Sequence, residues 1–145
     1  MDNRLNIPWI ALRFGIGLTA TLAGADKFFN LLADWGSYVS PLATRILPLS
    51  TPALMGVVGV VEFAVGMTIL AGWTRLGAYV ASAWLLAVAA NLVLAGYYDV
   101  AVRDVVMSLA AFTVARLAEV QSEATARDSG WEERHRSGLP TARPA

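Results

Sequence analysis

A single carboxyl group lies in the middle of a long apolar stretch of the sequence. Glu62 is the only ionisable side chain between Thr51 and Trp73. If this stretch crosses a lipid bilayer as a helix, an isolated charge near the midplane is costly, and the carboxyl is either paired or protonated. Arg13 lies inside an earlier apolar stretch and has a long side chain. We therefore predict an Arg13–Glu62 ion pair. The alternative is that Arg13 extends to the interface and Glu62 stays neutral.

Three further polar residues lie near the ends of apolar stretches, at helical spacing from small residues. They are Lys27, Asn91 and Asp104. Residues three and four positions apart share a helix face, so these side chains are expected on the faces that meet other helices. We expect them to line a polar mouth. The alternative, which we favour for Asp99, is a set of solvated interface charges whose salt bridges contribute little net energy.

The residues that the sequence lacks exclude several kinds of chemistry. There is no cysteine, so the chain forms no disulfide, thiolate metal site or iron–sulfur cluster of its own. Its one histidine, His135, lies in a polar C-terminal region, away from the apolar stretches. No catalytic triad, glycine-rich phosphate loop or metal cluster is visible. A formal net charge of zero gives no indication of nucleic acid as a partner. We therefore expect no catalytic residues, no metal and no independent catalytic activity.

Four apolar segments position these residues. Of the 145 residues, 57% are hydrophobic and only 15% charged, and the mean hydropathy is +0.55; a soluble domain carries about 25% charged residues. Helices of roughly 20 residues span the hydrocarbon core. We predict an all-α integral membrane four-helix bundle in residues 1–120, with helices at 8–25, 52–71, 76–96 and 100–120. Residues 121–145 are expected to form a polar cytoplasmic tail, a frayed helix end followed by disorder. The alternative is a tail that docks a partner around Trp131.

Basic residues are distributed unequally between the two sides of this predicted bundle. Seven arginines fall on one side and three basic residues on the other: Arg4, Arg75, Arg116, Arg127, Arg134, Arg136 and Arg143, against Lys27, Arg45 and Arg103. Cytoplasmic segments carry the excess of basic residues. We therefore expect a multi-pass protein of the cell inner (plasma) membrane with both termini cytoplasmic. The long connection at residues 26–51 would be extracytoplasmic, its aromatic residues lying at the membrane surface.

Small residues recur at helical spacing in the first two segments. Gly17 and Gly24 share one face of the first, and Gly59 and Gly66 share one face of the second. Lipid gives apolar helices little reason to associate, so contact faces are marked by small residues that allow close approach. We expect these two faces to meet. The first segment has a competing interpretation as a cleaved signal peptide ending in residues 23–25, but Arg13 interrupts it and three apolar segments follow.

Four short motifs occur in a fixed order along the chain. They are Arg13, GADKF at 24–28, GVVEFAVG at 59–66 and GWTR at 72–75. Together they resemble the pattern of the DoxX family of small four-helix membrane proteins of bacteria and archaea, over about residues 8–119. The resemblance implies that Arg13, Lys27, Glu62 and Arg75 belong to a polar core or ligand site. It also implies a link to thiosulfate:quinone oxidoreductase, with its DoxD and DoxA subunits, and to redox-stress complexes of the cell envelope.

Three classes of function remain open at this point. The class we favour is a non-catalytic membrane subunit or anchor of a redox complex, quinone-linked or thiol/sulfur-linked, in which polar groups bind the two carbonyls of a quinone. Its partners would be membrane lipid, redox-complex subunits and further copies of the chain. The second class is a proton or small-solute pathway through the buried charges. The third is a structural or assembly factor in which those charges only fix the helix register.

Overall fold

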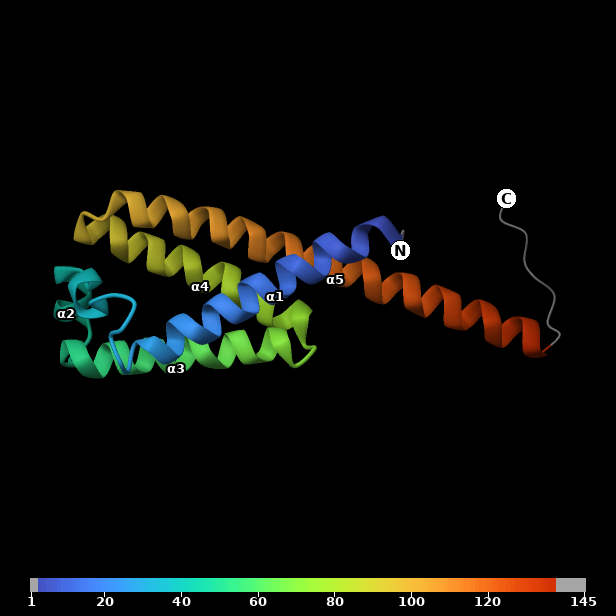
Figure 1. Ribbon diagram of the computed structural model, residues 1–145, viewed down its shortest axis with the longest axis horizontal. Helices are drawn as coiled ribbons and strands as arrows, with labels where there is room; N and C mark the ends of the chain where they lie inside the picture. Colours follow the sequence, from blue (N-terminus) through green and yellow to red (C-terminus); the bar gives the residue numbers. More distant parts are fainter. Residues whose placement is uncertain (1–2, 138–145) are drawn as a thin grey trace.

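Every regular element in the part of the chain that the structure describes, residues 3–137, is helical (Figure 1). In this computed structural model the elements are α1 (Asn3–Asp26), the 3-10 helix η1 (Trp35–Tyr38), α2 (Pro41–Ile46), α3 (Thr51–Leu70), α4 (Thr74–Ala95) and α5 (Tyr98–Ser137). The predicted all-α class is confirmed.

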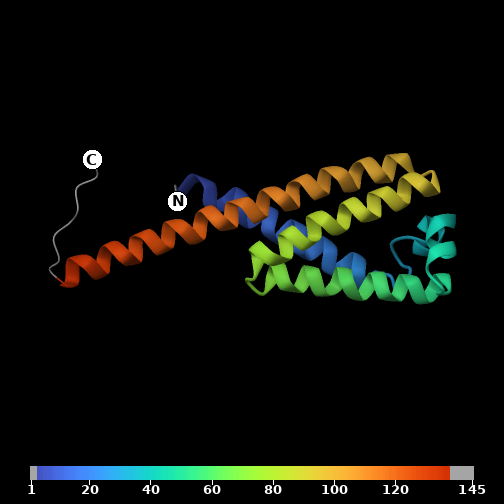
Figure 2. The same cartoon turned by 180° about the vertical axis from the view of Figure 1, so that it is seen from behind.

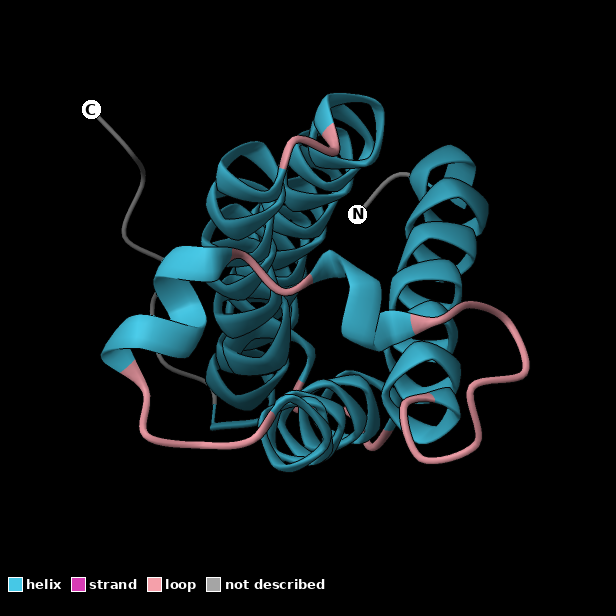
Figure 3. Ribbon diagram, turned by 90° about the vertical axis from the view of Figure 1, so that its left-hand side faces the viewer, coloured by secondary structure: helices cyan, strands magenta, loops and turns pink. Residues whose placement is uncertain are grey.

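The four long helices form two pairs that lie close together at one end of the molecule and diverge toward the other end. We call this arrangement the wedge. α1 packs along α3 and α4 packs along α5, as Figures 1 and 2 show from opposite sides. α3 and α4 are joined by a tight turn at the narrow end of the wedge. At the wide end, η1 and α2 lie across the mouth, where Figure 3 shows them in front of the long helices. The connection between α1 and α3 therefore forms a cover over the space between the pairs.

Glycine allows the close approach of α1 and α3. A Cβ atom added at Gly24 would lie 2.5 Å from the backbone nitrogen of Phe63, and one added at Gly66 would lie 2.6 Å from the backbone nitrogen of Thr21. Real Cβ atoms do not approach backbone this closely, so no larger residue fits without moving a helix. The predicted meeting of the two glycine faces is confirmed.

Among residues 3–137, three helices are long and apolar enough to cross a membrane, judged by length and composition. They cover Asn6–Asp26, Thr51–Leu70 and Thr74–Ala95. Large apolar side chains on their outer faces remain exposed, among them Leu18, Leu22, Val57, Val60 and Leu86. Such surfaces are unusual for a protein in water and suit contact with lipid.

The ends of the first and last helices differ from those expected. α1 begins at Asn3 rather than near residue 8, with Pro8 inside it, and α5 continues past residue 120 to Ser137. Residues 121–137 contain three Glu, three Arg and two Ala, which favour helix, and no proline. The expectation that this segment lacks regular structure is therefore wrong for residues 121–137, whereas residues 138–145 lie outside the described part. The division at residue 120 between a membrane part and a polar tail stays a prediction.

Candidate functional site

A cavity of about 760 Å³ occupies the wide part of the wedge. Its walls come from all four long helices, and η1 and the start of the connection cover it. Most of its surface is apolar, with Val58, Val65, Leu85 and Met107 among the wall residues. Its polar and aromatic lining residues include Lys27, Trp35, Tyr38, Glu62, Trp84, Asn91, Arg103 and Asp104. The cavity is thus an apolar chamber with a small set of polar groups, as is typical of small-molecule sites.

The central polar contact of the cavity is an ion pair between α3 and the residue that follows α1. The Nζ atom of Lys27 donates to Oε2 of Glu62 at 2.5 Å, and the two side chains are 5% and 13% exposed. The same ammonium group lies 3.8 Å from the ring centroid of Trp35, within the range of a cation–π interaction. Glu62 is therefore paired, and its partner is held in place by the covering segment.

The predicted Arg13–Glu62 pair is wrong. Arg13 donates from Nε to the carbonyl oxygen of Ile69 at 3.1 Å and from Nη2 to that of Leu70 at 2.8 Å. Gly24 faces the backbone of α3 at Phe63, next to Glu62, whereas Arg13 lies eleven residues earlier in α1, about 16 Å along the helix axis. The guanidinium is therefore level with the end of α3, where it satisfies carbonyl groups that have no partner inside the helix.

Asp104 and Trp84 supply two further polar groups of the cavity. Asp104 is buried, and Nε of Arg103 lies 3.4 Å from its Oδ1, a long contact. Lys27 also attracts it electrostatically. The indole Nε1 of Trp84 is buried and has no hydrogen-bond partner among the described residues. A buried donor without an acceptor is costly unless something supplies one, so this N–H marks a place where a ligand could bind.

Asn91 holds the cover over the cavity. Its Oδ1 accepts from the backbone nitrogen of Ser40 at 3.1 Å, and its Nδ2 donates to the carbonyl oxygen of Tyr38 at 2.8 Å. The ring of Tyr38 also packs edge-on against Tyr97, with 4.8 Å between centroids. Asn91 lines the cavity as expected, but its amide is used to fasten the connection to α4.

Asp26 orders the first turn of the connection. Its carboxylate accepts from the backbone nitrogens of Leu31 and Leu32, at 3.0 and 2.9 Å, and from Nε1 of Trp35 at 2.8 Å. Because Trp35 covers Lys27, this carboxylate fixes the cover against the ion pair. Sequence reasoning did not assign roles to Trp35 and Trp84. Trp84 lies seven residues before Asn91, on the same face of α4, and this spacing was the available signal.

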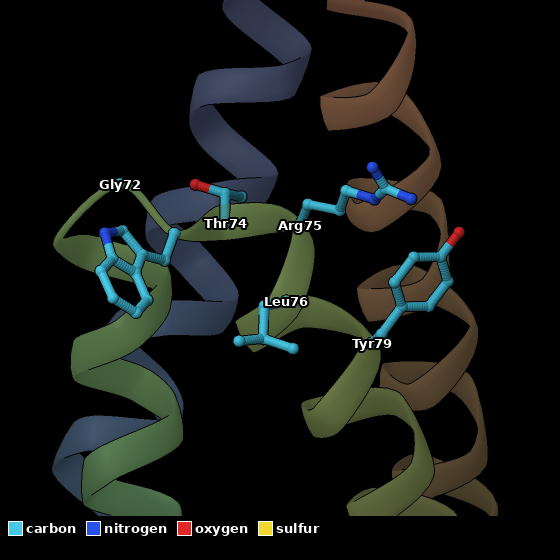
Figure 4. Close-up of a pocket in the computed structure, with 6 residues that line it drawn as sticks. Gly72, Thr74, Arg75, Leu76 and Tyr79 are labelled. Carbon is cyan, nitrogen blue, oxygen red and sulfur yellow. The ribbon is translucent and has the colours of Figure 1, made fainter. Parts of the chain in front are cut away.

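Arg75 lies away from the cavity, at the narrow end of the wedge. Its Nε lies 3.0 Å from Oε1 of Glu119, and the hydroxyl of Tyr79 donates to the same oxygen at 3.1 Å. The other carboxylate oxygen of Glu119, Oε2, pairs with Arg116. Figure 4 shows Arg75 and Tyr79 extending from α4 towards α5. The structure thus brings Lys27, Glu62, Asn91 and Asp104 to one cavity and places Arg13 and Arg75 at the opposite end.

Comparisons with models of protein families, with curated proteins and with solved structures give no match to this chain. The resemblance to the DoxX family therefore stays a prediction from short motifs. Among the described residues, no group of three or more His, Cys, Asp or Glu is arranged to hold a metal ion. The cavity is the feature from which a function can be argued.

Proposed function

We propose that the protein is a four-helix membrane protein that holds an amphipathic, membrane-soluble molecule of the quinone class in the wedge cavity. On this proposal α1, α3, α4 and the first half of α5 cross the inner membrane of the cell. The observation that carries the proposal is an apolar chamber of about 760 Å³ in which Lys27, Glu62, Asp104 and the unpartnered Trp84 donor come together.

The positions of the charged residues in the first half of α5 support its assignment as a fourth span. Its charges lie near the two ends of residues 100–120, as Arg103 and Asp104 at one end and Arg116 and Glu119 at the other. Asp104 is buried, and residues between these charged pairs pack against α4 or carry apolar side chains outward. Exposed arginines near span ends reach the interface with their long side chains.

The distribution of charge supports an orientation with both termini in the cytoplasm. Arg13, Arg75 and Arg116 lie at the narrow end, the end at which α1 begins and from which α5 extends onward (Figure 1). Lys27, paired with Glu62, lies at the wide end under the cover. The excess of basic residues at the narrow end favours the cytoplasmic side for it, so the cover would face outward.

The polar groups of the cavity match the needs of a quinone headgroup. A quinone has two carbonyl oxygens that accept hydrogen bonds. Lys27 and Trp84 both line the cavity, and the ammonium of Lys27 and the buried, unpartnered N–H of Trp84 are the donors that these residues carry. The apolar walls suit the ring and an isoprenoid tail. Because the chain offers no thiol and its one histidine is far along α5, we propose a role as the membrane subunit or anchor that presents quinone to a redox partner, as the DoxX resemblance implies.

Binding of a short-chain benzoquinone to the full chain in lipid nanodiscs tests this proposal, measured by titration calorimetry. Trp84→Phe keeps a ring but removes the N–H, and we expect about fivefold weaker binding, since one hydrogen bond contributes about 1 kcal/mol. Trp9→Phe is the matched control, because the Nε1 of Trp9 is also buried without a partner but does not line the cavity. Failure of the unaltered protein to bind, or equal losses in both variants, would overturn the proposal.

A proton pathway is the second candidate, favoured by the two carboxyl side chains, Glu62 and Asp104, on the same cavity. Measuring proton flux in proteoliposomes distinguishes a proton pathway from quinone binding. Proton flux that is lost in Asp104→Asn would support transport, whereas the absence of flux together with quinone binding would leave the first proposal alone. If the protein neither binds quinone nor conducts protons, its buried charges serve assembly.

A further inference from the structure

Three arginines from three different helices gather around the α3–α4 turn. Arg13 of α1 binds the last carbonyls of α3, and its Nη2 lies 4.0 Å from the position that a Cβ of Gly72 would occupy. Arg75 lies in the first turn of α4, and Arg116 lies on α5, where both contact Glu119. The narrow end of the wedge is therefore a cluster of cations, although the chain as a whole has no net charge.

The carboxylates near this cluster do not neutralise it. Glu119 is shared by Arg75 and Arg116. Glu123, one turn further along α5, attracts Arg116 electrostatically and lies 4.0 Å from Arg127. Arg13 contacts carbonyl groups, which carry only the partial negative charge of a helix end. Arg75, Arg116 and Arg127 thus share two carboxylates, which leaves one positive charge in excess, in addition to that of Arg13.

These cations are accessible from outside the helices. The side chains of Arg75 and Arg116 are 66% and 60% exposed. Beside Arg75 is an open hollow of about 520 Å³, lined by Gly72, Trp73, Thr74, Arg75, Leu76 and Tyr79 (Figure 4). Trp73 is 72% exposed and Leu76 is 58% exposed. The hollow thus joins a guanidinium group to an apolar and aromatic wall.

We infer that this hollow binds the phosphate headgroup of an anionic phospholipid, with Arg75 as the phosphate-binding residue and Trp73 and Leu76 against the upper acyl chain. Arg116 does not line the hollow, but it shares Glu119 with Arg75 and so adds positive charge beside it. The inference rests on the proposed membrane embedding but not on the quinone cavity. Arginine binds phosphate through several parallel N–H donors, and exposed tryptophan is enriched at headgroup level. The candidate spans end at Leu70 and begin again at Thr74, so the hollow lies at the depth of the headgroups.

Native mass spectrometry of the full chain, released from nanodiscs with equal amounts of phosphatidylcholine and phosphatidylglycerol, tests the inference. We expect the unaltered protein to retain phosphatidylglycerol preferentially. Arg75→Gln should reduce that preference about fivefold, the effect of one basic residue near an anionic surface, while Arg116 and Tyr79 still hold Glu119. Arg45→Gln is the matched control, because Arg45 lies in the last turn of α2 at the opposite end, and it should leave the preference unchanged.

Two further measurements distinguish lipid binding from a folding defect and from binding of free phosphate. Arg75→Lys keeps the charge and should recover part of the preference, which a folding defect would not allow. If excess inorganic phosphate is itself retained and removes the preference, the hollow is a site for free phosphate and the lipid inference is wrong. Equal retention of both lipids by the unaltered protein, or an equal loss in Arg45→Gln, would also overturn it. Quinone affinity, measured on the same Arg75 variants, should not change, so failure here is distinct from failure of the cavity proposal.

Discussion

The Lys27 ammonium and the Glu62 carboxylate meet across the α1–α3 interface, with 2.5 Å between Nζ and Oε2. The contact links the residue after α1 to the middle of α3. Because Trp35 of η1 lies over the same ammonium group, the pair also fastens the cover to the wall of the cavity. This interaction therefore contributes to the stability of the helix pair, to the position of the cover and to the polarity of the cavity.

Neutralising Glu62 alone should destabilise the protein strongly. Glu62→Gln leaves the Lys27 charge buried under Trp35 without its hydrogen-bonded counter-charge, and we expect the free energy of unfolding to fall by about 3 kcal/mol. Denaturant titration in micelles, followed by circular dichroism, measures this change. The double variant Lys27→Met/Glu62→Leu removes both charges and should regain most of the loss. A double variant as unstable as Glu62→Gln would contradict the pairing.

Enlarging Gly24 should separate α1 from α3. The Cβ of Gly24→Ala would meet backbone atoms of Phe63 and Gly59 at 2.5 and 2.7 Å, which cannot rotate away as a side chain can. We expect a loss of about 2 kcal/mol in the free energy of unfolding, as is typical of overpacking. Gly15→Ala is the matched control in the same helix. Its Cβ would meet nothing within 4 Å, and alanine favours helix over glycine, so stability should stay equal or rise.

The helices and their contact faces could be predicted from the sequence because both are periodic features of single segments. The partner of Glu62 could not, because it depends on the axial offset between α1 and α3. That offset is set by the close contact of Gly24 with Gly59 and Phe63. The spacing of glycines in the sequence was compatible with several other pairings of the two helices. The continuation of α5 to Ser137 was missed because polar composition was taken to indicate disorder, whereas those residue types also favour helix.

For the candidate site, the sequence indicated which side chains face the interior but not which groups they contact. The small-residue stripes correctly indicated that Lys27, Asn91 and Asp104 face the interior. The partners of Asn91, however, are backbone groups of Tyr38 and Ser40, and backbone groups leave no mark in a sequence. The unpartnered indole of Trp84 likewise follows from the width of the wedge, which no single helix determines.

Replacing Asn91 should loosen the cover. Asn91→Leu leaves the amide of Ser40 and the carbonyl of Tyr38 without their partners, and an unsatisfied buried group costs about 1–3 kcal/mol. We expect faster hydrogen exchange at Ser40 and easier proteolysis between η1 and α2. Asn91→Asp keeps the acceptor for the Ser40 amide but loses the donor to Tyr38, so Ser40 should stay more protected than in Asn91→Leu. Equal exchange in both variants would show that the amide does not hold the cover.

Removing the guanidinium of Arg13 should affect the end of α3 and leave the ion pair intact. Arg13→Leu loses the charged hydrogen bonds to Ile69 and Leu70, each of which contributes about 1.5–3 kcal/mol before compensation by water. We expect faster hydrogen exchange at the amides of Ala71 and Gly72, since both bind carbonyls in the last turn of α3. Arg13→Lys should restore little, because an ammonium group lacks the fork that reaches two successive carbonyls.

The same Arg13 variant separates the observed arrangement from the rejected one. If Arg13 supported Glu62, Arg13→Leu and Glu62→Gln would be coupled, and combining them would cost less than the sum of the two single losses. In the observed arrangement Arg13 binds carbonyls seven and eight residues beyond Glu62 in α3, about 11 Å along the helix axis. The two side chains share no partner, so their effects on the free energy of unfolding should add. Additive losses, with slow exchange kept in the middle of α3, would place Arg13 at the narrow end of the wedge and Lys27 alone beside Glu62.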